Sequence, residues 1–148
     1  MQFHNLYNHD FARVAVGVPL CRVADPAYNA QQTLDLMRQA HEQGAAVVAF
    51  PELGLSAYTC DDLFHQRALL DGCEAALARL LAASQDWATV AIVGLPLRLE
   101  QRLFNCAVAL QRGRLLAVWP KSYLPNYGEF YEVRQFSAAD QALAEEIE

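Results

Sequence analysis

The chain has 148 residues, of which 54% are hydrophobic and 19% charged, and this composition is typical of one globular unit with an apolar core. Its formal net charge of −6 argues against binding to nucleic acid or to an anionic membrane surface. No apolar run approaches the roughly 20 residues that a membrane-spanning helix needs.

The first half of the chain predicts a strand, a helix and a second strand. The β-branched run at residues 13–18 predicts the first strand. Asp25-Pro26 predicts a helix start, because aspartate accepts from free backbone N–H groups and proline is tolerated in the first turn. Gly44 can end that helix in a left-handed cap. The apolar run at residues 45–50 then predicts a strand covered on both faces, joined to the first by a parallel crossover.

The middle of the chain predicts a second helix and a third strand. Asp61-Asp62 can cap the helical stretch, and Asp71-Gly72 predicts a break within it. Residues 88–97 predict a strand that is interrupted at Gly94 and Pro96.

The last elements predict a hairpin and a polar tail. Residues 103–110 and 115–119 flank a turn at which Gly113 can take a positive φ. Residues 140–148 indicate an acidic, helix-prone tail. We therefore expect an α/β fold in which the first three strands and the hairpin share one sheet, with both long helices on one face.

Cysteine and histidine spacing favours neither a disulfide nor a metal site. No C-x-x-C pair occurs, so we expect reduced packing thiols in a cytoplasmic protein. The N-terminus lacks the charged and apolar regions of a signal peptide. The histidines form no ligand pair at helical or strand spacing, so metal-dependent hydrolysis ranks last and we expect no metal. The cysteines are Cys21, Cys60, Cys73 and Cys106.

The first stretch with chemical character is residues 50–58, Phe-Pro-Glu-Leu-Gly-Leu-Ser-Ala-Tyr. A buried strand holds its end rigidly, and the loop after it can line a cleft, so Glu52 is a candidate site carboxylate. For an isolated F-P-E, the alternative is that Pro51 only ends the strand and Glu52 lies in water.

The second such stretch is residues 120–134, Pro-Lys-Ser-Tyr-Leu-Pro-Asn-Tyr-Gly-Glu-Phe-Tyr-Glu-Val-Arg. Again a strand ends at a proline and an ionisable residue follows. Lys121 is the only lysine in the chain, and a site can use it as a compact ammonium whose pKa responds to burial. The alternative is a surface lysine whose aliphatic stem lies beside Tyr123.

Together, the two stretches resemble the nitrilase, or carbon–nitrogen hydrolase, superfamily, and more narrowly the glutaminase domains of glutamine-dependent NAD synthetases. The narrower resemblance rests on L-S-A-Y-x-x-x-D-L after the glutamate and on K-x-x-L-P-x-Y-x-x-F-x-E-x-R around the lysine. The segment Leu-Phe-Asn-Cys-Ala at residues 103–107 matches the family's aromatic-Asn strand. The resemblance covers residues 13–136.

The resemblance implies a nitrilase-like α-β-β-α sandwich, of which this chain carries the N-terminal half. Glu52 matches the superfamily's general base and Lys121 its catalytic lysine. Glu132 matches the acidic position in the lysine motif, with Glu129 as the less favoured occupant of that role. The aromatic residues expected to contact substrate as walls of the same cleft are Tyr58, Tyr127 and Phe130. We expect Glu52 and Lys121 at the ends of neighbouring strands, with their charged groups close enough to hydrogen-bond.

One departure from the family concerns the nucleophile, a cysteine that follows the lysine by some tens of residues. None of the cysteines present matches it by position. We therefore expect residues 1–148 to be a partial carbon–nitrogen hydrolase domain, from a larger polypeptide or a truncated copy, without its C-terminal part or a synthetase domain. As a separate chain it should be inactive, and an apolar sheet face with an unpaired edge should prevent a well-behaved monomer.

The implied function is hydrolysis of the glutamine amide, with the ammonia passing to ATP-dependent synthesis of NAD from deamido-NAD. The glutaminase domain would need no cofactor, the synthetase domain would use ATP and Mg, and the partners would be glutamine, that synthetase domain and further copies in a homo-oligomer. One alternative is a stand-alone nitrilase-type amidase for another small amide, which would lack an ATP-pyrophosphatase domain with an S-G-G-x-D loop. A second is a non-catalytic interaction module, favoured if no downstream cysteine exists.

Overall fold

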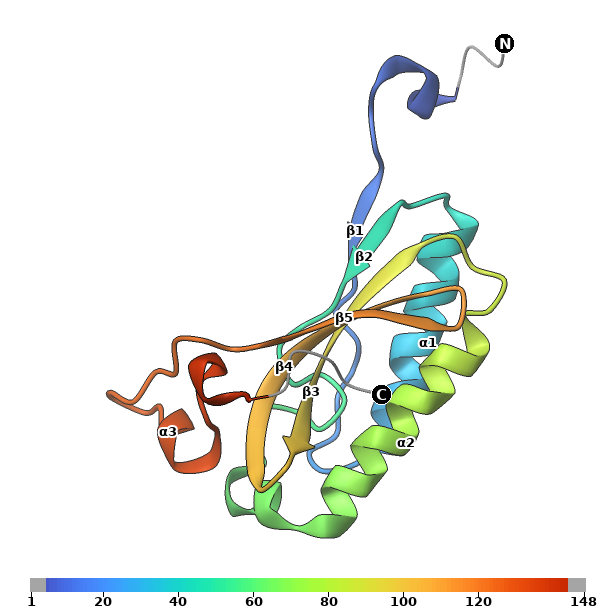
Figure 1. Ribbon diagram of the computed structural model, residues 1–148. Helices are drawn as coiled ribbons and strands as arrows, with labels where there is room; N and C mark the ends of the chain where they lie inside the picture. The colour runs from blue at the N-terminus through green and yellow to red at the C-terminus, as the bar shows by residue number, and fades with distance from the viewer. Residues whose placement is uncertain (1–4, 144–148) are drawn as a thin grey trace.

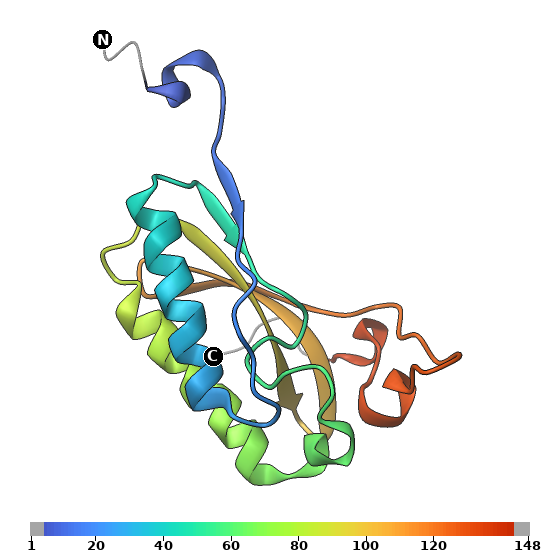
Figure 2. The ribbon, with the colours of Figure 1, turned by 180° about the vertical axis from the view of Figure 1, so that it is seen from behind.

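The structure is a computed structural model that describes residues 5–143. Its five strands form one sheet in the order β1-β2-β3-β4-β5, parallel from β1 to β3 and antiparallel from β3 to β5. Helices α1 and α2 lie side by side on one face of this sheet (Figures 1 and 2). The predicted α/β sheet with one helical layer is confirmed. The elements are β1 (Val14–Val16), α1 (Pro26–Glu42), β2 (Val47–Ala49), α2 (Arg67–Ala83), β3 (Val90–Leu99), β4 (Arg102–Gln111) and β5 (Arg114–Pro120).

Helix α1 begins and ends where the sequence predicts. The Asp25 carboxylate accepts the backbone N–H of Tyr28 at 3.1 Å, and Pro26 occupies the first turn. Gly44 follows the helix with a φ of +69°, in the left-handed region that glycine adopts without steric cost. Leu34 and Met37 lie on the face of α1 that packs against the sheet and α2, and both are buried.

The predicted break at Asp71-Gly72 is wrong, because α2 runs through both residues without interruption. The helical stretch is broken earlier, at Gln66, which is extended between a 3₁₀ turn (Asp61–His65) and α2. A Cβ on Gly72 would lie 3.3 Å from Cγ of Pro26. Gly72 therefore permits the close crossing of α1 and α2 instead of ending a helix.

The predicted interruption of β3 at Gly94 and Pro96 is also wrong, because β3 pairs with β4 through both residues. Parallel pairing of β3 with β2 ends at Ile92. The edge of β3 that faces β2 is therefore unpaired with any strand at Pro96, and no N–H donor is needed there. The predicted hairpin is confirmed: Arg112 and Gly113 have φ of +51° and +71°, the positive values of a tight two-residue turn.

The sheet face away from the helices carries exposed apolar side chains. Val14, Val16 and Trp119 are 71%, 79% and 54% exposed, while alternate residues such as Val93 and Val108 are buried toward the helices. Phe50 and Ile92 add partly covered apolar surface near the middle of the same face. This open face is where the chain places its polar cluster, described below.

A 3₁₀ turn (Ala139–Gln141) occupies the start of the predicted acidic tail, and residues 144–148 lie outside the described residues.

Between residues 5 and 143, no helix is both long and apolar enough to cross a membrane.

The cysteines are free thiols, as predicted, and three of them are buried. Burial raises the pKa of Cys73 and of Cys106 to about 12. Because the thiolate is the reactive form, we expect a thiol reagent to modify the exposed Cys21 at least about 10²-fold faster than these two. Absorbance with Ellman's reagent, before and after denaturation, measures this difference. Labelling of Cys106 at the rate of Cys21 would contradict it.

Candidate active site

The loop after β2 places Glu52 by crossing the open face of β3 at Gly94. Phe50 N–H donates to the Ile92 carbonyl at 2.9 Å, and Leu55 N–H donates to the Gly94 carbonyl at 3.0 Å. A Cβ on Gly94 would lie 2.5 Å from the backbone nitrogen of Leu53, closer than real Cβ atoms come. Because Gly94 has no side chain, the loop can lie directly on β3. The loop then brings Glu52 toward β4 and β5.

The part of the loop that follows Glu52 is held in place by packing and hydrogen bonds. Leu53 has a φ of +52°, a left-handed conformation that is costly for a leucine. Leu53 and Leu55 are 0% and 1% exposed, and the buried Ser56 hydroxyl donates to the Leu53 carbonyl at 3.1 Å. Packing and hydrogen bonding together maintain this strained turn, which fixes the direction of Glu52.

Lys121 lies directly after β5 and joins two carboxylates. Its Nζ is 2.7 Å from Oε1 of Glu52 and 2.9 Å from Oε1 of Glu132. The predicted contact between Glu52 and Lys121 is confirmed. The predicted placement on neighbouring strands is wrong, because β3 and β4 lie between β2 and β5. The crossing at Gly94 brings the two groups together instead.

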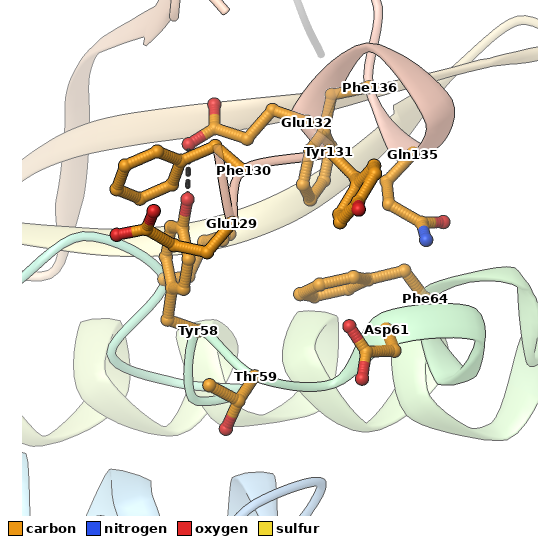
Figure 3. Close-up of a pocket in the computed structure, with 11 residues that line it drawn as sticks. Tyr58, Thr59, Asp61, Phe64, Glu129, Phe130, Tyr131, Glu132, Gln135 and Phe136 are labelled. Atoms are coloured by element: carbon orange, nitrogen blue, oxygen red, sulfur yellow. Dashed lines mark hydrogen bonds between the residues drawn. The ribbon is translucent and has the colours of Figure 1, made fainter. Parts of the chain in front are cut away.

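Glu132 is the buried member of this cluster. It begins the short helix α3 (Glu132–Gln135), is 5% exposed, and accepts the Tyr58 hydroxyl on Oε1 at 2.6 Å (Figure 3). Its Oε2 is buried without a hydrogen-bond partner in the described part of the chain. Arg134 donates to both carboxylate oxygens of Asp62, at 2.9 and 3.2 Å, and so ties α3 to the 3₁₀ turn before α2.

Two pockets adjoin the cluster. Glu52 and Lys121 line a pocket of about 400 Å³ on the open face, with Phe50, Ile92 and Trp119 in its walls. A smaller pocket, of about 120 Å³, lies beside Glu132 (Figure 3). The aromatic residues of the smaller pocket include Tyr58, Phe64, Phe130 and Tyr131.

The prediction that Tyr58, Tyr127 and Phe130 share one cleft with Glu52 and Lys121 is wrong, because the two charged residues line the larger pocket and these aromatic residues lie at the smaller one. Tyr58 and Phe130 line it, whereas Tyr127 is 73% exposed and contacts Phe130 edge-on, with ring centroids 5.9 Å apart. Glu129 is exposed at the rim, so Glu132 is the glutamate that contacts Lys121. Cys106 adjoins the larger pocket, but its thiol is buried and, with a pKa of about 12, protonated at neutral pH.

The electrostatics of the cluster keep Lys121 charged and Tyr58 neutral. Burial alone would lower the pKa of Lys121, but hydrogen bonds to Glu52 and Glu132 and their negative charges raise it above its ordinary value. Burial, the hydrogen bond to Glu132 and nearby carboxylate charge raise the pKa of Tyr58. The site thus presents a fixed ammonium between two carboxylates and a phenol that donates to one of them.

This charge state is directly measurable because Lys121 is the only lysine. Protein labelled with ¹⁵N-lysine should give one side-chain ammonium signal, titrating above the ordinary pKa of 10.5. Glu52→Gln and Glu132→Gln should each lower the pKa of Lys121, whereas Glu74→Gln on the exposed face of α2 should not. A raised pKa means that the ion pairs stabilise the fold below pH 10.5 and that this stabilisation is lost as pH rises through the folded pKa. Titration of Lys121 at or below its ordinary value would contradict the ion-pair geometry.

Two residues with evident roles in the site were not identified as such from sequence. The sequence pattern predicts a strand interruption at Gly94, and it matches Asn105 to a family strand without giving it a role. Asn105 Nδ2 donates to Oε1 of Glu52. A lone amide within an apolar strand is the signal that could have singled it out, since a buried polar group needs a partner. Within residues 5–143, no group of three or more histidine, cysteine, aspartate or glutamate side chains is arranged to hold a metal ion.

Comparison with known proteins identifies relatives of this chain. The glutamine-dependent NAD(+) synthetase of Mycobacterium tuberculosis is 47% identical over 140 residues, which cover 95% of this chain and 21% of the relative. That of Aquifex aeolicus is 33% identical over 125 residues, covering 84% of this chain and 22% of the relative. The chain thus spans about a fifth of the length of the curated relatives it matches.

Solved structures agree with these sequence relatives. The glutamine-dependent NAD(+) synthetase from Cytophaga hutchinsonii superposes with a TM-score of 0.80 over 86% of this chain and 22% of that chain, at 24% identity, and so shares the fold. An amidase from Nesterenkonia sp. AN1, with the acetamide moiety of fluoroacetamide bound covalently at its active-site cysteine, superposes with a TM-score of 0.73 at 26% identity. This superposition covers 88% of this chain and 49% of the amidase chain. Residues 13–145 match the carbon-nitrogen hydrolase family, and the chain belongs to that family.

Proposed function

We propose that this chain supplies the general base and the catalytic lysine of a glutaminase site in a glutamine-dependent NAD synthetase. The observation that carries the proposal is the Lys121 ammonium held between the carboxylates of Glu52 and Glu132, at 2.7 and 2.9 Å. The 47% identity to the Mycobacterium tuberculosis synthetase supports glutamine as the amide donor. The nucleophilic cysteine would come from a segment outside this chain, which we treat as part of the carbon–nitrogen hydrolase domain.

The chemistry follows from the two charged groups. Glu52 takes the proton from the incoming thiol, and the thiolate attacks the side-chain amide carbon of glutamine. Lys121 stabilises the oxyanion that develops on the amide oxygen. Glu52 then returns the proton to the departing ammonia and activates the water that cleaves the thioester. The products are glutamate and ammonia, and the ammonia passes to ATP-activated deamido-NAD on a synthetase domain that uses Mg.

The other residues of the cluster would orient the substrate. Glu132 keeps one oxygen on both Lys121 and Tyr58, and so would hold the ammonium and the phenol in place beside the substrate. Phe130 in the smaller pocket and Tyr127 beside it would form the aromatic wall that the substrate contacts. The exposure of Glu129 makes it the weaker candidate for the second acidic residue.

A hybrid protein tests this function. The chain replaces the corresponding 140 residues of the Mycobacterium tuberculosis synthetase, whose remainder supplies the other parts of the enzyme. We expect glutamate release and NAD formation with glutamine, and NAD formation with ammonium. A hybrid that forms NAD from ammonium but releases no glutamate from glutamine would overturn the proposal.

A stand-alone amidase is the second candidate, favoured by the Nesterenkonia amidase, of which this chain covers 49%. The two functions differ in substrate and in coupling. Hydrolysis of acetamide or another short amide with a higher kcat/KM than glutamine would favour the amidase. Dependence of NAD formation on glutamine would favour the synthetase.

A further inference from the structure

We propose that Asn105 is the positioning residue of this site, fixing the base through its side chain and the lysine through its main chain. Its Nδ2 donates to Oε1 of Glu52, and its carbonyl accepts the backbone N–H of Lys121 at 2.8 Å. One residue of β4 thereby holds groups from the loop after β2 and from the end of β5. The catalytic consequence rests on the proposed glutaminase function, whereas the positioning itself does not.

The burial of Asn105 argues that its amide is present for this contact. Asn105 is 3% exposed and lies between the buried Phe104 and Cys106, opposite Pro96 of β3. A buried amide without a partner is costly, and an apolar side chain of similar size would fill this space at no such cost. A carboxylate only accepts hydrogen bonds, so the amide must present its NH₂ group to Glu52.

The hydrogen bonds also decide which oxygen of Glu52 is free to react. Oε1 accepts from both Asn105 and Lys121. Holding Oε1 from two directions prevents rotation of the carboxylate and leaves Oε2 to take the proton of the thiol. Because the amide has no acidic proton, Asn105 provides this support without competing for the proton that Glu52 must carry.

The first test uses the 148-residue chain and does not depend on catalysis. In Asn105→Leu, Glu52 loses the hydrogen bond from Asn105 and holds Lys121 less firmly. The Lys121 ammonium should then exchange its hydrogens with water about tenfold faster, as measured by ¹⁵N NMR. Gln111→Leu is the matched control, because it removes the amide that bonds the Ala88 carbonyl at the other end of β4. Asn105→Val, which also lacks the amide donor and suits a strand, should behave like Asn105→Leu. Unchanged exchange in both Asn105 variants would overturn the proposal.

The second test measures the catalytic consequence in the hybrid protein. Asn105→Leu should lower kcat for glutamine about 10²-fold with KM within about twofold, because a misplaced base slows chemistry without removing substrate contacts. Ammonium-driven NAD formation should be unchanged, as should both activities of Gln111→Leu. An unchanged kcat, or a loss confined to KM, would overturn the positioning role. If the unsubstituted hybrid releases no glutamate, the proposed function fails, and the exchange measurement still decides the role of Asn105.

Discussion

Exchanging Lys121 for arginine should lower glutamine hydrolysis by the hybrid protein about 10²–10³-fold while ammonium-driven NAD formation stays intact. The Lys121 ammonium contacts oxygens of two carboxylates at 2.7 and 2.9 Å, and its side chain is 28% exposed. A guanidinium is planar and larger, so it cannot place one compact charge between those carboxylates and the developing oxyanion. Ammonium bypasses the glutaminase site, so the synthetase reaction reports that the rest of the protein is folded.

Removing the charge of the base should have at least as large an effect. Glu52→Gln should lower glutamate release about 10²–10⁴-fold, because an amide cannot take the proton of the thiol. Glutamate and NAD are measured with saturating glutamine and then with ammonium.

Matched controls separate these losses from general effects of substitution. Arg114→Lys at the exposed start of β5 and Glu74→Gln on α2 change the same chemical groups away from the site and should leave glutamine hydrolysis unchanged. Full glutaminase activity in Lys121→Arg would show that the lysine has been assigned the wrong role.

Much of the fold could be predicted because its signals are local. The Asp25 cap, the apolar strands and the Arg112-Gly113 turn each depend on residues adjacent in sequence. The sequence predictions are wrong at glycine and proline residues whose role depends on a distant partner. Gly72 accommodates Pro26 of another helix, and Pro96 is tolerated because β2 has ended beside it.

The candidate site shows the same division between local and distant information. Two strand ends with ionisable residues predicted the contact of Glu52 with Lys121, but not how the chain would bring the two residues together. The sheet order separates β2 from β5, and only the crossing of the Glu52 loop over β3 closes that distance. The role of Asn105 follows from this crossing, so the spacing of residues in sequence could not predict it.

The crossing itself depends on Gly94, where a Cβ would lie 2.5 Å from Leu53 N and 2.7 Å from Pro51 O. Both atoms belong to the backbone that carries Glu52, so neither can move aside without moving the carboxylate. Gly94→Ala should therefore shift the loop away from β3 and separate Glu52 from Asn105 and Lys121.

We expect Gly94→Ala to lower the free energy of unfolding of the chain by about 1–3 kcal/mol and glutamine hydrolysis by the hybrid about 10²-fold or more. Gly72→Ala is the matched control, since its Cβ meets only the Pro26 side chain, at 3.3 Å, and the better helix propensity of alanine offsets that contact. It should change stability by less than about 1 kcal/mol and leave activity intact. Denaturant unfolding and glutamate release measure the two effects. Gly94→Ala with unchanged stability and full activity would show that the loop does not need this close approach to hold Glu52.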